Sequence, residues 1–382
     1  MKIGIVTLYD NRNFGNRLQN YAVQMYFEHM GFQTETFSHK KYLSTDLSTV
    51  KVIRHWIAMP IHFLIRATEY EKKRLKRIQT NVAREKTIAA FTLEYIYCGS
   101  IISKYRFPKS IRADYDFFVT GSDQVWHCWS GSRRELEFFF LRFADSSQRL
   151  TIAPSFGFNE FPKKYLKTYK KGLEGFKYLS VREERGAELI KELTGKDATV
   201  LLDPTMLIDT SEWLKILRQP SQYVDDNYIF VYSLGDFKGD VKDKTYALAT
   251  DLGLQVIDIM DKDSDYYIHT RPDEFLYWIH NARLIVTDSF HASVFSMLFN
   301  RPFVVTERSD LKGMGSRFDT LFHKFGITGR HFDELKDGFE EAGEARDRLF
   351  QTEYSGISAV LDAERKKADE FYKKCFQKGD SK

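Results

Sequence analysis

The chain has 382 residues, a length that at roughly 150 residues per domain fits two domains or one large one. Apolar residues make up 43% and charged residues 29%, with a net charge of +4, so the composition excludes a disordered protein and predicts a packed core. The three cysteines (Cys98, Cys128 and Cys375) include no C-x-x-C pair, which excludes a disulfide framework, argues against a zinc site and predicts a reducing compartment.

The beginning of the chain indicates a βαβ unit. Residues 2–8 (KIGIVTL) predict a strand, and the polar residues 9–16 predict the loop that follows it. A helix is expected over residues 17–30, with Asn16 as its N-cap. Residues 33–37 can then return as a second strand.

Positive charge is concentrated in residues 40–112, which hold 16 Lys and Arg against 5 Asp and Glu. Residues 71–77 (EKKRLKR) favour a helix, and mostly apolar residues lie just before it. This pattern is typical of a segment on an anionic membrane surface, so peripheral association with the inner membrane face is one interpretation. An ordinary solvated helix is the other. Nucleic acid is not an expected partner, because the total charge is nearly balanced and no known binding module occurs.

No segment of the sequence is suited to cross a membrane. Uninterrupted apolar runs stay below the 18 or so residues that a spanning helix needs, and the apolar stretch at the N-terminus is too short for a secretory signal. We therefore expect a cytoplasmic protein.

Short apolar strands alternate with helices through the rest of the chain. Strands are predicted at 115–120, 150–154, 178–182, 199–202, 228–233, 255–260, 283–287 and 302–306. Helices are predicted at 184–193, 241–252, 272–282, 291–299 and, in a charged segment, from 345 to about 377. This alternation predicts parallel sheets with right-handed crossovers.

The polar residues 219–227 separate two series of strands. We expect one Rossmann-like domain at 1–215, with a basic helical insertion at about 40–112, a second at 216–345, and a C-terminal helix at 346–382. Two such α/β domains facing a cleft form the GT-B arrangement of glycosyltransferases, in which ligands bind beyond the carboxyl ends of the strands. The loops expected to line the cleft are 9–16, 120–126, 182–185, 233–236 and 287–291.

Three turns after predicted strands carry residues suited to chemistry. His291 begins a helix, where the N-terminal amides favour an anion and an imidazole can transfer a proton. Arg182 is suited to hold a carboxylate or a phosphate, and Asp123 can act as a base toward a sugar hydroxyl. Each also has a purely structural interpretation: a helix-start histidine bonded to backbone, an Arg–Glu salt bridge, and a helix N-cap.

Motifs for nucleotides and metals are missing from the sequence. It contains no P-loop, no G-x-G-x-x-G and no H-E-x-x-H. Residues 261–265 (DKDSD) begin like a calcium loop but lack the glycine and the glutamate that such a loop needs. We expect no metal and no resident cofactor.

Six segments resemble, in the same order, the motifs of the polysaccharide pyruvyl transferase family. They are NFGNRLQNYA (13–22), VTGSDQVW (119–126), APSFG (153–157), SVRE (180–183), LDPT (202–205) and ARLIVTDSFH (282–291). The resemblance covers residues 1 to about 330 and implies a fold similar to two-domain glycosyltransferases. It implies an enzyme that moves the enolpyruvyl carbons of phosphoenolpyruvate onto a sugar hydroxyl pair as a cyclic ketal, in the synthesis of a capsule, exopolysaccharide or cell-wall polymer.

The resemblance also implies roles for single residues. Arg182 would hold the donor, His291 of the second domain, the donor side, would contact its phosphate or act as the acid, and Phe290 would shape the pocket. Asp123 would be the base on the acceptor, which the first domain would bind. Further substrate contacts are implied at Asn16, Ser289 and Arg317. Some branches of the family carry Arg-Leu-His where this chain has Ser-Phe-His at 289–291, so one donor contact comes from elsewhere or the donor differs.

The partners implied are phosphoenolpyruvate, as a co-substrate, and a sugar or lipid-linked oligosaccharide acceptor. Two other functions stay open. One is a glycosyltransferase that uses a sugar nucleotide in the same cleft. The other is a non-catalytic member of a polysaccharide assembly complex.

Overall fold

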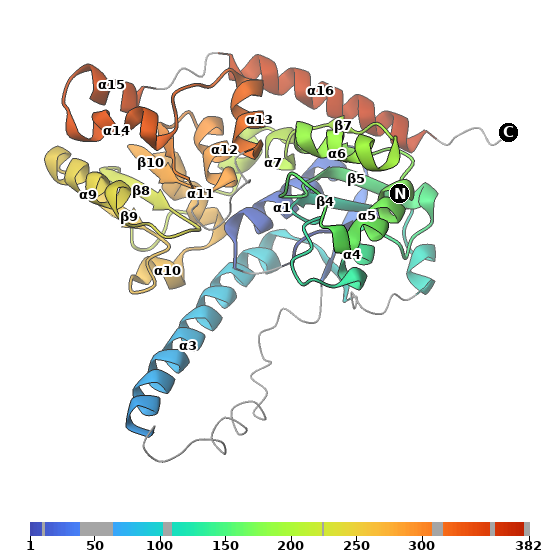
Figure 1. Ribbon diagram of the computed structural model, residues 1–382, viewed down its shortest axis with the longest axis horizontal. Coiled ribbons are helices and arrows are strands. Elements are labelled where there is room, and N and C mark those ends of the chain that lie inside the picture. Colours follow the sequence, from blue (N-terminus) through green and yellow to red (C-terminus); the bar gives the residue numbers. More distant parts are fainter. Residues whose placement is uncertain are drawn as a thin grey trace.

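The computed structural model describes residues 1–9, 12–38, 64–101, 109–223, 225–307, 316–351 and 356–377. Within these residues two parallel sheets, each flanked by helices, form two lobes that lie side by side (Figure 1). We call the lobe built on the N-terminal sheet the first lobe and the other the second lobe.

The sheet of the first lobe has, in the described residues, the strand order β3-β2-β1-β4-β5, and all its pairs are parallel. Its strands are β1 (Lys2–Val6), β2 (Gln33–Ser38), β3 (Cys98–Ile101), β4 (Phe117–Asp123) and β5 (Arg149–Pro154). The central strands β1 and β4 are apolar and buried on both faces, as parallel strands covered by helices require. A short parallel pair, β6 (Ser180–Val181) and β7 (Thr199–Val200), continues this layer beside β5.

Helix α1 (Phe14–His29) follows β1 and begins earlier than the sequence predicts. Its N-cap is Asn13, whose side chain accepts the Asn16 backbone N–H at 3.4 Å, so the prediction of Asn16 as the N-cap is wrong. The cause is tertiary, because Phe14 is fully buried and stacks on Phe275 of the second lobe, 5.0 Å between ring centroids. The other helices of this part of the chain are α3 (Leu64–Tyr95), α4 (Arg133–Phe139), α5 (Leu166–Glu174), α6 (Glu184–Thr194), α7 (Pro204–Leu207) and α8 (Thr210–Lys215).

The sheet of the second lobe has, in the described part of the chain, the order β11-β10-β8-β9, again with parallel pairs only. Its strands are β8 (Tyr228–Tyr232), β9 (Gln255–Asp258), β10 (Leu284–Thr287) and β11 (Phe303–Val305). Its helices are α9 (Asp240–Leu252), α10 (Asp265–His269), α11 (Pro272–Asn281), α12 (Phe290–Leu298), α13 (Ser316–Phe325), α14 (Phe332–Glu340) and α15 (Glu344–Phe350).

The two lobes share one hydrophobic core, because a single cluster of buried side chains contains residues from both sheets. Trp213 of α8 links them: its ring lies 5.5 Å from that of Tyr21 on α1 and 4.9 Å from that of Phe295 on α12. Continuous packing of this kind places the carboxyl ends of the two sheets opposite each other in this structure.

Helix α3 is 32 residues long, and its N-terminal part extends away from both lobes (Figure 1). Its C-terminal part is anchored by Ile88 and Phe91, both fully buried in the shared core. A helix within the basic insertion was predicted, and α3 confirms it for residues 64–95. Residues 40–63 of that insertion lie outside the described residues.

Helix α16 (Ile357–Phe376) runs across both lobes (Figure 1). Near its start, Glu364 forms an ion pair of 2.9 Å with Lys324 of the second lobe. Near its end, the Tyr372 hydroxyl donates to the Thr151 carbonyl of β5 at 2.6 Å. The last turns of α16 therefore pack against the first lobe.

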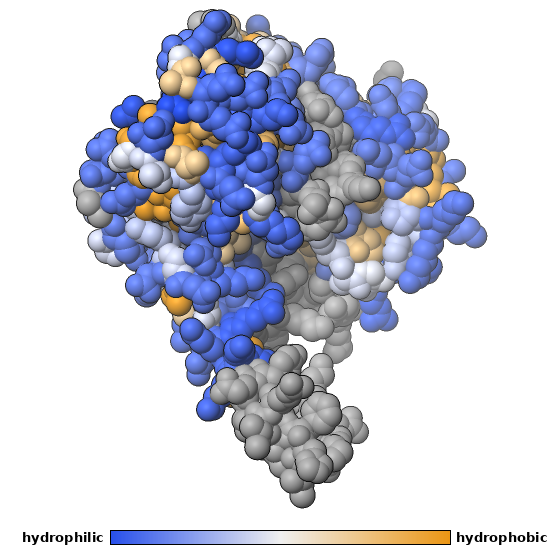
Figure 2. Space-filling model, turned by 60° about the vertical axis from the view of Figure 1, so that its left-hand side comes forward, coloured by the Kyte–Doolittle hydropathy of each residue, from blue (hydrophilic) through white to orange (hydrophobic). Residues whose placement is uncertain are grey.

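The face of the molecule shown in Figure 2 is mainly hydrophilic, as the high share of charged residues predicts. Apolar side chains occur there in small patches. Among the described residues, no helix combines the length and the apolar character needed to cross a bilayer.

Candidate functional site

Arg182 lies at the centre of a cluster that joins both lobes. It follows β6, and its side chain is only 3% exposed. Nη1 donates to Asp203 Oδ2 at 3.0 Å, Nε donates to Glu183 Oε1 at 3.0 Å, and Nη2 lies 3.7 Å from Asp123 Oδ1. The flat face of the guanidinium lies 4.5 Å from the ring centroid of Phe290, the first residue of α12. Residues of three strand ends in the first lobe thus meet one helix start in the second.

The three carboxylates decide the charge state of Arg182. Burial lowers the pKa of the guanidinium, but the charges of Glu183, Asp203 and Asp123 outweigh burial, and the pKa lies above its ordinary value. The guanidinium nitrogens differ in their contacts: Nε and Nη1 donate hydrogen bonds, whereas Nη2 has no hydrogen-bond partner among the described residues. Arg182 is therefore a fixed cation with one nitrogen left for a further acceptor. The salt bridge to Glu183 that the structural interpretation expected is also present.

Asp203 connects the cluster on its buried side. It is the N-cap of α7, and Oδ1 accepts the Thr205 backbone N–H at 3.1 Å. Oδ2 accepts from Ser122 Oγ at 2.8 Å and from Arg182, and it lies 3.8 Å from His291 Nε2. Burial raises the pKa of Asp203, but His291, Arg182 and these hydrogen bonds together hold it below its ordinary value. An ionised carboxylate thus lies between a guanidinium and an imidazole.

His291 is held in place by the backbone of the first lobe. It lies in the first turn of α12, whose N-cap Ser289 accepts the Ala292 backbone N–H at 3.5 Å. Gly15 packs so closely against the imidazole that an added Cβ would lie 2.3 Å from His291 Nδ1. A larger residue would clash there, so the first turn of α1 and the first turn of α12 are matched to each other.

Asp123 ends β4 in an unusual backbone conformation. Its φ is +61°, in the left-handed region that non-glycine residues seldom occupy, and such conformations concentrate at functional sites. Its carbonyl accepts the backbone N–H groups of Val125 and Ser155, each at 2.8 Å, which holds this geometry. No described helix begins at Asp123, so the N-cap interpretation is wrong. The carboxylate is 11% exposed and is the most open of the three around Arg182.

The space beside this cluster is small. A cavity of about 10 Å³, enough for one water molecule, lies between the lobes. Its lining includes Arg182, Asp203 and Phe290, together with Leu321 and Lys324 of α13.

The remaining predicted residues divide into two groups. Ser289 serves as the cap described above, and Asn16 is 4% exposed in the first turn of α1, where its carbonyl accepts from Gln19 Nε2 at 3.0 Å. Arg317 belongs to α13, but its side chain lies outside the described residues.

Sequence reasoning missed two members of the cluster and the close contact at Gly15. Asp203 was recognised only as part of a motif, and Glu183 was expected only as a structural salt-bridge partner of Arg182, so no role at the site was expected for either carboxylate. The Asp-Pro-Thr sequence is a clear helix-start signal, yet nothing local places it next to Arg182 or His291.

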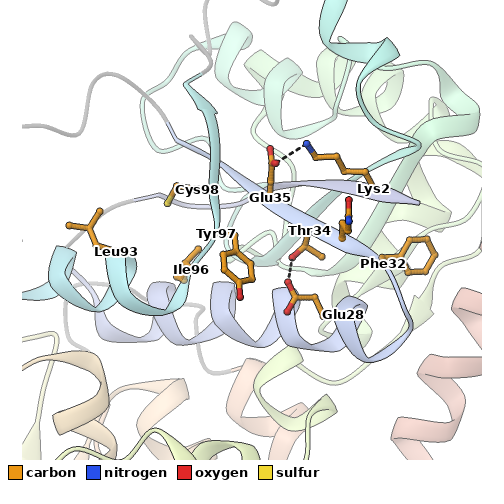
Figure 3. Close-up of a pocket in the computed structure, with 10 residues that line it drawn as sticks. Lys2, Glu28, Phe32, Thr34, Glu35, Leu93, Ile96, Tyr97 and Cys98 are labelled. Atoms are coloured by element: carbon orange, nitrogen blue, oxygen red, sulfur yellow. Dashed lines mark hydrogen bonds and ion pairs between the residues drawn. The ribbon is translucent and has the colours of Figure 1, made fainter.

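A larger hollow, of about 680 Å³, lies elsewhere in the first lobe (Figure 3). It is at the amino ends of β1 and β2, the end opposite to the one where ligands of parallel sheets bind. Its charged groups are already paired: Glu35 with Lys2 at 2.7 Å, and Glu28 with the Thr34 hydroxyl at 2.8 Å (Figure 3). Size alone therefore does not make it the better candidate.

Comparisons with known proteins bear on the fold and the family. The sequence model of the polysaccharide pyruvyl transferase family matches residues 13–310. No curated protein matches the chain. A protein from Listeria monocytogenes described as a UDP-N-acetylglucosamine 2-epimerase is 8% identical, with 99% of this chain and 97% of that one covered and a TM-score of 0.51. The UDP-GlcNAc 2-epimerase of Methanocaldococcus jannaschii, in complex with UDP-GlcNAc and UDP, is 11% identical, with 97% and 100% covered and a TM-score of 0.48. Identities this low show the fold alone, and the likeness to the Listeria structure confirms the predicted GT-B arrangement.

Proposed function

The chain belongs to the polysaccharide pyruvyl transferase family, and from that premise we propose that it transfers the pyruvyl unit of phosphoenolpyruvate to two hydroxyls of a sugar. The single observation that carries the proposal is the cluster in which Asp203 Oδ2 binds Arg182 and lies 3.8 Å from His291. It supplies a fixed cation, a titratable imidazole and a nearby carboxylate at the carboxyl ends of both sheets, as an anionic donor and a hydroxyl acceptor require.

The reaction needs three proton transfers, one to the donor and one from each sugar hydroxyl. A proton added to the methylene carbon of the donor makes the neighbouring carbon electrophilic, and a sugar hydroxyl adds to it. Phosphate then leaves and a second hydroxyl closes the ketal. Of the two protons that the hydroxyls release, one replaces the proton delivered to the methyl group and the other leaves with the phosphate.

In this proposal, His291 delivers the first proton, and Asp203 behind it stabilises the imidazolium form. Asp123 accepts a proton from the acceptor hydroxyl, since its carboxylate is the most open of the cluster. Arg182 Nη2 donates to an oxygen of the donor, because this nitrogen lacks a hydrogen-bond partner in the described residues. The reaction needs no resident cofactor, because charged side chains can neutralise the departing phosphate.

Phosphate release tests this function. The purified protein is mixed with phosphoenolpyruvate and a panel of galactosides, and phosphate is followed with time. We expect release that depends on the acceptor, and its near loss in His291→Gln and Asp123→Asn. His280→Gln is the matched control, because His280 lies at the end of α11 and contacts Asn281 rather than the cluster. Equal rates in all four proteins would exclude the proposed roles.

A sugar nucleotide is the alternative donor. The Methanocaldococcus epimerase binds UDP-GlcNAc and UDP, so the same fold accommodates such ligands. Melting curves separate the two, because a ligand that binds only the folded protein raises its Tm. A rise with UDP-GlcNAc but not with phosphoenolpyruvate favours glycosyl transfer. No rise with either ligand favours a non-catalytic role in a polysaccharide assembly complex.

We also propose that the protein works in the cytoplasm, against the inner membrane face, where a lipid-linked acceptor is held. The support is the part of α3 that extends from the lobes, where Lys72, Lys73, Lys76 and Arg77 are exposed beside Leu75, itself 49% exposed. Each basic residue near an anionic surface contributes about 1 kcal/mol of attraction. Co-sedimentation with phosphatidylglycerol vesicles should exceed that with phosphatidylcholine vesicles and fall when the four cations are replaced by Gln. Equal binding to both vesicles would exclude membrane attachment through α3.

A further inference from the structure

Arg84 is a buried cation that lies outside every motif of the sequence. It is carried by α3 and is 3% exposed. Nη1 donates to the Tyr267 carbonyl at 2.6 Å, and Nη2 lies 3.4 Å from Met260 Sδ. The guanidinium lies between two rings, 4.7 Å from the centroid of Phe14 and 4.4 Å from that of Tyr267. An arginine of the first lobe is thus buried against residues of the second lobe.

No carboxylate pairs with Arg84 in the part of the chain that the structure describes. Burial lowers the pKa of its guanidinium, and only the phenols of Tyr232 and Tyr267 act in the opposite direction. The contrast with Arg182 and its three carboxylates is sharp. Burying a cation without an anion costs several kcal/mol, and the two aromatic faces offset only part of that cost.

The position of Arg84 is the one where ligands of this fold bind. Phe14 opens α1 directly after the loop that follows β1, and its neighbour Gly15 contacts His291. Tyr232 is the last residue of β8, and Met260 follows the end of β9. Arg84 therefore lies at the carboxyl ends of both sheets, and the first two residues of α1 connect it to the cluster of Arg182: Phe14 contacts Arg84 and Gly15 contacts His291.

We propose that Arg84 binds an anionic group of a substrate, a phosphate or a carboxylate, at the junction of the lobes. A guanidinium has five N–H groups, and the contacts above use two of them. The others are enough for a bidentate contact with a phosphate or a carboxylate. The inference rests on the proposed function for the identity of the substrate. It makes the α3 insertion part of the binding site, and it requires the lobes to separate as the ligand enters.

Two sources can supply the anion. The first is phosphoenolpyruvate, whose carboxylate and phosphate are both anionic. The second is the diphosphate of a lipid-linked acceptor or of a sugar nucleotide, for which inorganic pyrophosphate is the probe. Calorimetric titration of the full chain with each probe distinguishes them.

Arg84→Gln is the main variant, because it removes the charge and keeps a polar side chain that donates hydrogen bonds. Arg84→Lys keeps the charge. Arg149→Gln is the matched control, since Arg149 also donates to a backbone carbonyl, that of Ala144, but lies at the amino end of β5. If Arg84→Gln does not fold, Arg84→Met replaces it as a neutral variant that keeps the apolar stem between the rings.

We expect the neutral variant to weaken phosphoenolpyruvate binding by tenfold or more, which is about the contribution of a charged hydrogen bond. Arg84→Lys and Arg149→Gln should stay within about fivefold of the wild type, a loss of less than 1 kcal/mol. Weakened binding of pyrophosphate alone assigns the anion to the acceptor or nucleotide. A third outcome separates the two proposals. If the wild type binds pyrophosphate through Arg84 but does not bind phosphoenolpyruvate, this inference is supported and the proposed function is overturned. Unchanged affinity for both probes in the neutral variant, or no binding of either by the wild type, overturns the inference.

Discussion

Replacing Gly15 by alanine tests whether the contact between the lobes positions His291. The added Cβ would lie 2.3 Å from Nδ1 and 2.7 Å from Cγ of the imidazole, where ordinary contacts begin at about 3.4 Å. Either the ring or the first turn of α1 must therefore move by about 1 Å. Overpacking of this size costs about 1–3 kcal/mol.

The expected effect on catalysis is larger than the effect on stability. Alanine is favoured over glycine within a helix by about 1 kcal/mol, which offsets part of the clash in the free energy of unfolding. A displacement of about 1 Å at a catalytic group, by contrast, can cost on the order of 100-fold in rate. We expect Gly15→Ala to shift Tm by only a few degrees and to lower kcat by about 10- to 100-fold.

The assay compares phosphate release, melting curves and the NMR signals of the His291 ring in Gly15→Ala and in a control. Gly186→Ala is the control, because the nearest atom to its added Cβ, Val181 Cβ, lies at an ordinary contact distance of 3.5 Å. It also lies in a helix, α6, so the gain in helix propensity is similar. Wild-type turnover in Gly15→Ala, with unmoved ring signals, would refute the view that this contact positions His291.

Three further predictions concern stability. Asp203→Asn should cost about 3 kcal/mol in the free energy of unfolding, because it removes the buried anion that pairs with Arg182 and lies beside His291. Since the pKa of Asp203 is depressed on folding, its contribution is complete above its ordinary value of 3.8 and is lost as the pH falls through the folded value. Urea unfolding followed from pH 7 down to about pH 2 should therefore show a steeper acid loss in the wild type than in the variant, and parallel curves would contradict this. Phe290→Leu removes the ring under Arg182 and should cost about 1–2 kcal/mol in urea unfolding, whereas no loss would show that this ring contact adds nothing. Tyr372→Phe removes the hydrogen bond to the Thr151 carbonyl and should lower unfolding free energy by about 1 kcal/mol, measured in the same way, and an unchanged value would mean that water replaces the hydroxyl.

Single-residue tests at Arg182 are less informative than its central position suggests. From the sequence, Arg182→Ala is expected to abolish turnover and leave the fold intact. In the structure the guanidinium separates Glu183, Asp203 and Asp123, so its removal leaves three carboxylates around an empty space. Loss of activity in that variant would not distinguish lost donor binding from lost folding.

The alternation of strands and helices is well predicted from the sequence, because apolar runs and turn residues are local signals. The ends of elements depend on tertiary packing. The strand predicted at 178–182 is reduced to Ser180–Val181, and α1 starts at Phe14 because Asn13 and Asn16 are both adequate caps and the burial of Phe14 selects the first.

Part of the candidate site could be predicted, because strands and the turns after them are local signals in the sequence. Arg182, His291 and Asp123 follow strand ends, and the topology of parallel sheets brings strand ends together. Arg84 carried no such signal, since a basic helix in the sequence looks the same whether its arginines face water or a second lobe. Its burial between Phe14 and Tyr267 depends on contacts across up to 183 positions of the chain.

The course of α16 has a consequence for how the chain is made. Phe376 packs 4.5 Å from the ring of Phe32 and 5.1 Å from that of Phe117, both in the first lobe. The lobe that leaves the ribosome first therefore lacks part of its interior until the last helix has been synthesised. Truncation within α16 should therefore make the first lobe of a newly made chain less stable, because Phe32 and Phe117 lose their ring contacts with Phe376.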